Sequence, residues 1–146
     1  AGCSQGGLVS ALCAAECNKY VKALLLYYPA LCIPDDARRG HMITARFDPE
    51  RIPETFYAIS VKLGRKYADD AASLDPYKEI CAYDKPVLIV HGIEDTLVSI
   101  AYSRKAADRY ENCKLVEVHG DHGFIRKGFK ACEKATLEFL NENDLI

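Results

Sequence analysis

The sequence predicts an α/β fold in which parallel strands are flanked by helices. Apolar runs at residues 21–28, 86–91 and 114–118 have the composition of strands that are buried on both faces of a sheet. The segments between and after these runs have helical spacing, and this alternation of strand and helix is typical of a parallel sheet. Ligands of such sheets bind at the carboxyl ends of the strands, so the loops that follow strands are the expected functional loops.

The helices are predicted from their apolar spacing and from their caps. A tight turn of small residues, Gly2 to Gly7, leads into the first of them, and Ser99 is a suitable N-cap for the second. The predicted helices span about residues 5–18, 99–110 and 124–141. The side chains expected on the buried face of the first and last helices are Leu8, Leu12, Ala15, Ile125, Phe129, Cys132 and Phe139.

Residues 33–82 interrupt the alternation of strands and helices. Prolines divide this segment, and aromatic residues are scattered through it. It is too rich in apolar residues for a disordered linker. We therefore expect an inserted subdomain of short elements, with a helix at about residues 53–63.

Composition restricts the class of protein. The chain of 146 residues can form one core, and its 49% hydrophobic and 27% charged residues are ordinary for a globular domain. A net charge of −2 argues against a nucleic-acid partner, and no apolar run reaches the roughly 18 residues of a membrane helix. Seven scattered cysteines without a second metal-ligand pair favour free thiols in a reducing compartment, which predicts a cytoplasmic location.

The segment Gly2-Cys3-Ser4-Gln5-Gly6 has the pattern G-x-S-x-G of a nucleophile elbow. In such an elbow the serine lies on a strained turn between strand and helix, and small residues two positions away avoid clashes. The helix N-terminus favours developing negative charge, and the N–H of Gln5 is the predicted oxyanion donor. Gly-rich turns before helices are common, so an ordinary turn is the alternative.

Two further loops carry polar residues after predicted strands. Asp95 is placed to orient a histidine, although an Asp here could simply cap the next helix. His122 is preferred to His119, which belongs to the end of a strand, although a lone histidine often has only a structural role. The order Ser, Asp, His, each after a strand, is that of the α/β-hydrolase triad. We therefore predict Ser4, Asp95 and His122 as catalytic residues.

The stretches GCSQGG, LDPYKEICAYDKPVLIVHGIEDTLVS and VEVHGDHGF are similar to the C-terminal part of α/β hydrolases. The chain most resembles bacterial esterases of the cinnamoyl and feruloyl type. This resemblance covers the whole chain but only part of the family's domain, and it implies that residues 33–82 form a lid. Phe47, Phe56 and Tyr57 would then line an acyl pocket, or alternatively form the core of the lid.

The chain departs from these esterases in two respects. Cys3 stands where relatives often have histidine before the serine. The N-terminal half of the family's domain is also missing from this sequence, including the strand that leads into the elbow. The loop that donates the second oxyanion N–H lies in that half as well.

The resemblance implies hydrolysis of carboxylic esters, including hydroxycinnamate esters, through an acyl-enzyme on Ser4. His122 would be the general base and Asp95 would orient it. The expected partner is a small-molecule ester, and no metal or organic cofactor is implied. The alternatives are a related serine hydrolase (peptidase, thioesterase or lipase) and a folded fragment without turnover.

We expect weak or no activity from the chain alone. Three strands would leave a sheet edge exposed, and the loss of one oxyanion donor typically costs about 10²–10³ in rate. A second chain that pairs with this edge and completes the sheet would restore activity.

Overall fold

The computed structural model describes residues 1–146 and divides them into two compact units, residues 1–31 with 76–146, and residues 32–75. The first unit is built on a parallel sheet with strand order β1-β2-β7-β8. Its strands are β1 (Gly2–Cys3), β2 (Leu24–Tyr27), β7 (Val87–Gly92) and β8 (Cys113–Val118). The predicted α/β class with a parallel sheet is confirmed.

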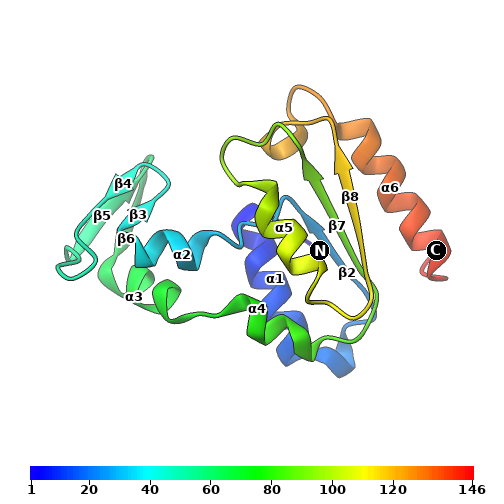
Figure 1. Ribbon diagram of the computed structural model, residues 1–146, viewed down its shortest axis with the longest axis horizontal. Helices are drawn as coiled ribbons and strands as arrows, with labels where there is room; N and C mark the ends of the chain where they lie inside the picture. Colours follow the sequence, from blue (N-terminus) through cyan, green and yellow to red (C-terminus); the bar gives the residue numbers. More distant parts are fainter. The chain divides into compact units, whose positions relative to one another are not determined.

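Helices flank both faces of this sheet. Figure 1 shows α1 (Ser4–Glu16) and α5 (Ile100–Ala107) on one face, and α6 (Phe129–Glu142) on the other. Shorter elements are α4 (Pro76–Glu79) and the 3₁₀ helices η1 (Asn18–Tyr20), η2 (Ile80–Ala82) and η3 (His122–Phe124). Ser99 caps α5 as predicted, since its hydroxyl accepts a hydrogen bond from the amide of Ala101.

The core of the first unit follows from the composition of β7, in which every residue is buried. Side chains alternate between the two faces of a strand, so Leu88 and Val90 face the opposite side from Ile89 and His91. Leu88 and Val90 belong to one apolar cluster with Phe139 of α6. His91 is the one polar residue of the strand, and it is fully buried.

The expectation that no strand leads into Ser4 is wrong. Gly2 and Cys3 form the two-residue strand β1, which pairs in parallel with Leu26 and Tyr27 of β2. The chain therefore enters the turn at Ser4 from the sheet, although over a short length.

Two helices differ in detail from the prediction. The buried face of α1 consists of Gly7, Leu8, Ala11 and Ala14, so Leu12 and Ala15 lie at its border. The last helix begins at Phe129 rather than near residue 124, because Gly123 and Gly128 adopt positive φ angles of 83° and 101°. Ile125 and Phe129 consequently lie outside the core, with 84% and 66% of their surface exposed.

The second unit contains two hairpins and two helices. Its elements are α2 (Ile33–Arg38), β3 (His41–Met42), β4 (Ala45–Arg46), β5 (Thr55–Ala58), β6 (Val61–Gly64) and α3 (Arg65–Ser73). The unit begins one residue before the expected insertion of residues 33–82 and ends at Asp75, so residues 76–82 belong to the first unit.

The predicted helix at residues 53–63 is wrong, because this segment forms the antiparallel pair β5 and β6. Phe56 and Ala58 are buried, whereas Thr55 and Tyr57, which alternate with them along the strand, are exposed. This period of two belongs to a strand, and Thr, Phe and Tyr favour strands. The turn is closed by Ile59 at a φ of 58°.

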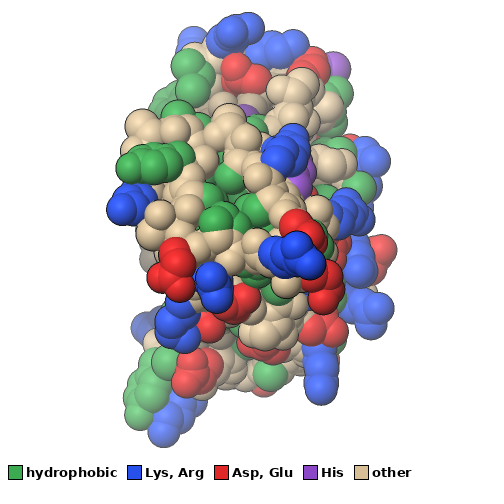
Figure 2. Space-filling view, turned by 90° about the vertical axis from the view of Figure 1, so that its left-hand side faces the viewer, with side chains coloured by type: hydrophobic (Ala, Val, Ile, Leu, Met, Phe, Trp, Pro, Cys, Tyr) green, Lys and Arg blue, Asp and Glu red, His purple; other side chains and the backbone are tan.

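The surface carries charges of both signs. On the face that Figure 2 shows, basic and acidic side chains lie beside one another. None of the helices has both the length and the apolar character that crossing a membrane requires. All seven cysteines are free thiols, of which Cys32 and Cys132 are buried.

Candidate active site

The carboxyl ends of the four parallel strands bring four residues to one edge of the sheet. Ser4 directly follows β1, and Tyr28 directly follows β2. Asp95 lies in the loop after β7, and His122 is the first residue of η3, which follows β8. This edge is the ligand-binding edge of parallel α/β sheets.

Ser4 occupies a strained turn between β1 and α1. Its φ angle is 50°, in the left-handed region that a residue with a Cβ seldom adopts. A Cβ on Gly2 would come within 2.2 Å of the carbonyl oxygen of Gly6, so the first glycine of the motif is required by a close backbone approach. The second glycine is different: a Cβ on Gly6 would meet nothing within 4 Å. The expected need for a small side chain therefore holds for Gly2 only.

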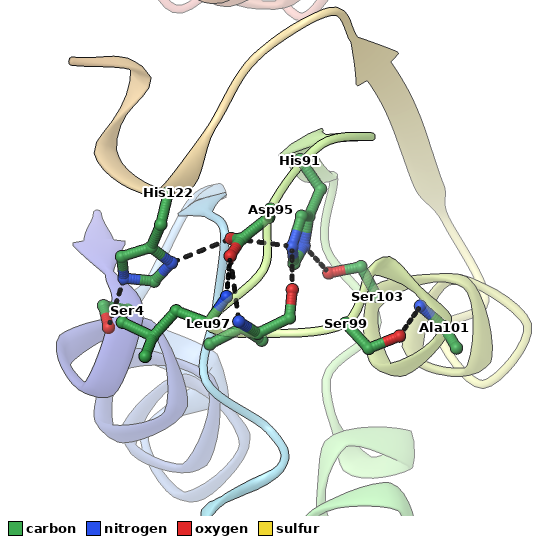
Figure 3. A network of polar contacts seen from close by, with 9 residues as sticks. Ser4, His91, Asp95, Leu97, Ser99, Ala101, Ser103 and His122 are labelled. Atoms are coloured by element: carbon green, nitrogen blue, oxygen red, sulfur yellow. Dashed lines mark hydrogen bonds and ion pairs between the residues drawn. The ribbon is translucent and has the colours of Figure 1, made fainter. Parts of the chain in front are cut away.

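Ser4, His122 and Asp95 form a continuous series of hydrogen bonds (Figure 3). His122 Nε2 lies 3.1 Å from Ser4 Oγ, and His122 Nδ1 lies 2.8 Å from Asp95 Oδ2. An ionised carboxylate only accepts hydrogen bonds, so Nδ1 carries the proton and Nε2 is free to accept one from the serine. The arrangement can therefore increase the nucleophilicity of Ser4 Oγ.

The carboxylate of Asp95 is held by its own loop. Its Oδ1 accepts hydrogen bonds from the amides of Leu97, at 2.8 Å, and Val98, at 2.9 Å. The Asp95 side chain is fully buried, whereas 22% of the His122 side chain is exposed. Asp95 is thus fixed inside the protein, while part of the His122 side chain reaches the surface.

Backbone contacts join the loop of Asp95 to the loop of His122. The amide of Ile93 donates to the carbonyl of Val118, at 2.9 Å, and the amide of Glu94 donates to that of Gly120, at 3.1 Å. A Cβ on Gly92 would lie 2.2 Å from the Gly120 oxygen. This close approach holds the two loops at the separation at which Asp95 can reach His122.

His91 is a residue of the site that the sequence analysis did not single out. Its Nε2 lies 3.2 Å from Asp95 Oδ2 and 3.0 Å from the carbonyl oxygen of Val98. Its Nδ1 lies 2.7 Å from Ser103 Oγ. Burial lowers the pKa of His91, so the imidazole is neutral. The available signal in the sequence was a histidine within an otherwise apolar strand, four residues before the acid.

Tyr28 is the second residue that the sequence analysis did not single out. Its ring contacts that of His122 edge to face, with 4.7 Å between centroids, and that of Phe124, with 5.1 Å. Burial, followed by a hydrogen bond with the Cys3 side chain, raises the pKa of Tyr28 to about 12. The uncharged ring supports one side of the His122 imidazole. Its position at the carboxyl end of a strand could have indicated this role.

The other predicted site residues are placed as follows. Gln5 lies in the first turn of α1, where backbone amides have no partner within the helix, so its N–H is free to donate. Phe47 and Phe56 lie in the second unit and contact each other, with 4.9 Å between ring centroids. Phe56 belongs to the core of that unit and the half-buried Phe47 packs against this core, whereas 60% of Tyr57 is exposed. Their role in an acyl pocket stays a prediction.

His119 lies outside the series of hydrogen bonds that joins Ser4, His122 and Asp95. Its side chain is 82% exposed, and Nδ1 lies 3.2 Å from Glu94 Oε1. Glu94 also binds Lys127 Nζ at 2.7 Å. Hydrogen bonds, first with Lys127 and then with His119, lower the pKa of Glu94 to about 2. Glu94, in the loop of Asp95, is thus joined by charge to His119 and Lys127, which flank the segment of His122.

This ion pair predicts a pH dependence of stability. A carboxylate whose pKa is lower in the folded state stabilises the protein above its unfolded pKa, here 4.5, and loses this effect as the pH falls towards about 2. Wild type should therefore melt at a higher temperature than Glu94→Gln at pH 7, and the two should converge near pH 2. A Glu16→Gln variant, which alters a carboxylate outside the ion pairs, should match wild type at both pH values. A constant difference for Glu94→Gln would contradict the assignment.

No group of three or more His, Cys, Asp or Glu side chains is placed to hold a metal ion.

Comparison with known proteins identifies the fold. No model of a protein family matches the chain, and no curated protein matches it. Among solved structures, Est1E from Butyrivibrio proteoclasticus is similar, with a TM-score of 0.91 and 36% identity over 99% of this chain and 60% of Est1E. A structure of Est1E with ferulic acid bound gives the same TM-score and identity, over 100% of this chain and 59% of that one.

More distant structures share the fold alone. The monoacylglycerol lipase of Paleococcus ferrophilus has a TM-score of 0.67 and 17% identity, over 99% of this chain and 67% of that one. The chain thus spans about 60% of the length of Est1E and has the fold of that part of an α/β-hydrolase domain. The resemblance predicted from the sequence is confirmed.

Proposed function

We propose that this chain, as part of an α/β-hydrolase domain similar to Est1E, supplies the nucleophile, base and acid of a serine esterase. The observation that carries the proposal is the series Ser4 Oγ–His122 Nε2 and His122 Nδ1–Asp95 Oδ2, at 3.1 and 2.8 Å, with Ser4 at a φ of 50°. A base within hydrogen-bond reach of a serine, itself oriented by a carboxylate, is the arrangement of an activated nucleophile.

The proposed reaction has two steps. Ser4 Oγ attacks the ester carbonyl while its proton passes to His122 Nε2, and collapse of the tetrahedral intermediate gives an acyl-enzyme. His122 returns the proton to the leaving alcohol, and water then releases the acid by the same route. Asp95 stabilises the imidazolium that forms in each step. The free N–H of Gln5 at the start of α1 is the proposed oxyanion donor.

Hydroxycinnamate esters are the substrates that we propose. The support is the similarity to Est1E, which has been solved with ferulic acid bound. The aromatic side chains Phe47, Phe56 and Tyr57 of the second unit are the proposed contacts for the acyl group. A flat, apolar acyl group with a polar ring substituent suits aromatic side chains in this role.

A further part of the domain is proposed to complete the site. Strand β1 pairs only with Leu26 and Tyr27, which leaves Leu24 and Leu25 of β2 unpaired on that side. An unpaired strand edge of a parallel sheet is a surface for another strand. A polypeptide that adds strands there would also support the turn at Ser4 and supply a second oxyanion donor.

Ester hydrolysis, with and without the remainder of the domain, tests the proposal. The 146-residue chain alone should hydrolyse p-nitrophenyl acetate and methyl ferulate weakly or not at all. Addition of a polypeptide that contains the rest of an Est1E-like domain should raise the rate, and Ser4→Ala should abolish the gain. Ser10→Ala, a matched change on the same helix, should keep it. A preference for a peptide amide or a long-chain ester would contradict the proposed substrate class, and full activity of the monomer would contradict the need for completion.

A further inference from the structure

His91 lies between the catalytic acid and helix α5, and all its polar atoms are engaged (Figure 3). The side chain is fully buried, so water cannot satisfy either ring nitrogen. Ser103, its partner on α5, is also fully buried. Each of these contacts therefore constrains where the protons of the imidazole are.

The contacts define the tautomer of His91. Nε2 faces only acceptors, namely the carbonyl oxygen of Val98 at 3.0 Å and Asp95 Oδ2 at 3.2 Å. Nε2 must therefore carry the proton of the neutral ring, and Nδ1 must accept a hydrogen bond. Ser103 Oγ, 2.7 Å from Nδ1, is the donor of that bond.

The carboxylate of Asp95 consequently has partners on both oxygens. Oδ1 accepts from the amides of Leu97 and Val98, while Oδ2 accepts from His122 and faces the Nε2–H of His91. An ionised carboxylate offers about four lone-pair sites. Three hydrogen-bond donors point at this one, and its Oδ2 also lies 3.2 Å from the His91 Nε2–H that is shared with the Val98 carbonyl. Rotation of the carboxylate would leave buried donors without acceptors, which is costly.

We propose that His91 is a positioning residue of the triad: its Nε2–H holds Asp95 Oδ2 in the place where that atom accepts the Nδ1–H of His122. This rests on the proposed function of Ser4, His122 and Asp95. His91 touches neither the nucleophile nor a substrate, and it acts only through Asp95. Its effect is to keep His122 in the tautomer that leaves Nε2 free for the serine proton.

Three variants separate this role from a structural one. His91→Leu removes the donor to Asp95, whereas His91→Gln retains an N–H at a position close to that of Nε2. Ser103→Ala removes a buried hydrogen bond from the same imidazole but leaves the contact between Nε2 and Asp95. If His91 had only a packing role, His91→Leu and Ser103→Ala would have the same effect on the tautomer of His122. The proposed role predicts that the tautomer of His122 changes only in His91→Leu.

Nitrogen-15 NMR of the histidine side chains in the 146-residue chain is the main measurement. In wild type we expect His91 protonated at Nε2 and His122 protonated at Nδ1. In His91→Leu, the share of His122 protonated at Nε2 should rise, and the rate of labelling of Ser4 by a fluorophosphonate should fall roughly tenfold to a hundredfold, as expected for the loss of one hydrogen bond to a charged group. His91→Gln should restore most of both properties, and Ser103→Ala should resemble wild type.

Two results would overturn the proposal. One is a wild-type His91 protonated at Nδ1, which is measurable even where His91→Leu does not fold. The other is a folded His91→Leu with the wild-type tautomer of His122. The tautomers do not depend on turnover, so absence of Ser4 labelling in wild type would count against the esterase proposal, while the His122 comparison would still decide the role of His91.

Discussion

Replacement of Asp95 by asparagine should lower the rate at which a fluorophosphonate labels Ser4 by about 10⁴-fold, the cost typical of losing the acid of a triad. The structure explains why no orientation of the amide is suitable. Oδ1 of Asp95 accepts hydrogen bonds from the amides of Leu97 and Val98. Its Oδ2 accepts one from His122 Nδ1 and faces Nε2 of His91. An asparagine NH₂ would face donors on either side.

In Asp95→Asn, His122 can avoid the contact between two donors only by a change of tautomer. If its Nδ1 accepts from the asparagine NH₂, Nε2 carries the proton and can no longer take one from Ser4. The matched control is Glu94→Gln, which neutralises the adjacent carboxylate but changes only exposed ion pairs with Lys127 and His119. Glu94→Gln should keep a labelling rate close to that of wild type. Equal losses in the two variants would contradict the assignment of Asp95 as the acid.

Gly92→Ala should destabilise the protein by about 1–3 kcal/mol or more, the usual cost of overpacking a buried position. Its Cβ would lie 2.2 Å from the oxygen and 2.6 Å from the carbonyl carbon of Gly120. Both atoms belong to the backbone, so no side-chain rotation can relieve the contact. The loops of Asp95 and His122 would have to separate, and labelling of Ser4 should decrease as well.

Gly6→Ala is the control for this substitution. A Cβ at this position of α1 meets nothing within 4 Å, and alanine favours a helix over glycine by up to about 1 kcal/mol. Its free energy of unfolding should equal or exceed that of wild type, as measured by denaturant unfolding. A stable Gly92→Ala, or a Gly6→Ala that is equally destabilised, would contradict the steric explanation.

The parts of the site that the sequence predicted depend on local patterns. Ser4 stands in a motif whose glycines and following helix are adjacent in the chain, and Asp95 and His122 each follow a strong apolar run. The carboxyl ends of parallel strands meet at one edge, so these positions could be expected to come together before any distance was known.

The parts that were missed depend on contacts between distant segments. His91 meets Ser103 across the space between β7 and α5, and no local pattern indicates this pairing. The need for glycine at position 7, where a Cβ would come within 2.8 Å of Pro29, arises where α1 passes the segment after β2. The hairpin of β5 and β6 was mistaken for a helix because each of its strands has only four residues, which is too few for its period of two to be decisive.

The position of a covalent fluorophosphonate adduct tests most directly whether Ser4 is the nucleophile. The folded 146-residue chain would be treated with the reagent, digested and mapped by mass spectrometry, with Ser4→Ala and Ser10→Ala treated in parallel. We expect the adduct on Ser4 in wild type and in Ser10→Ala, and no adduct in Ser4→Ala. A folded wild-type chain without an adduct, or with its adduct on another serine, would contradict the triad proposed here.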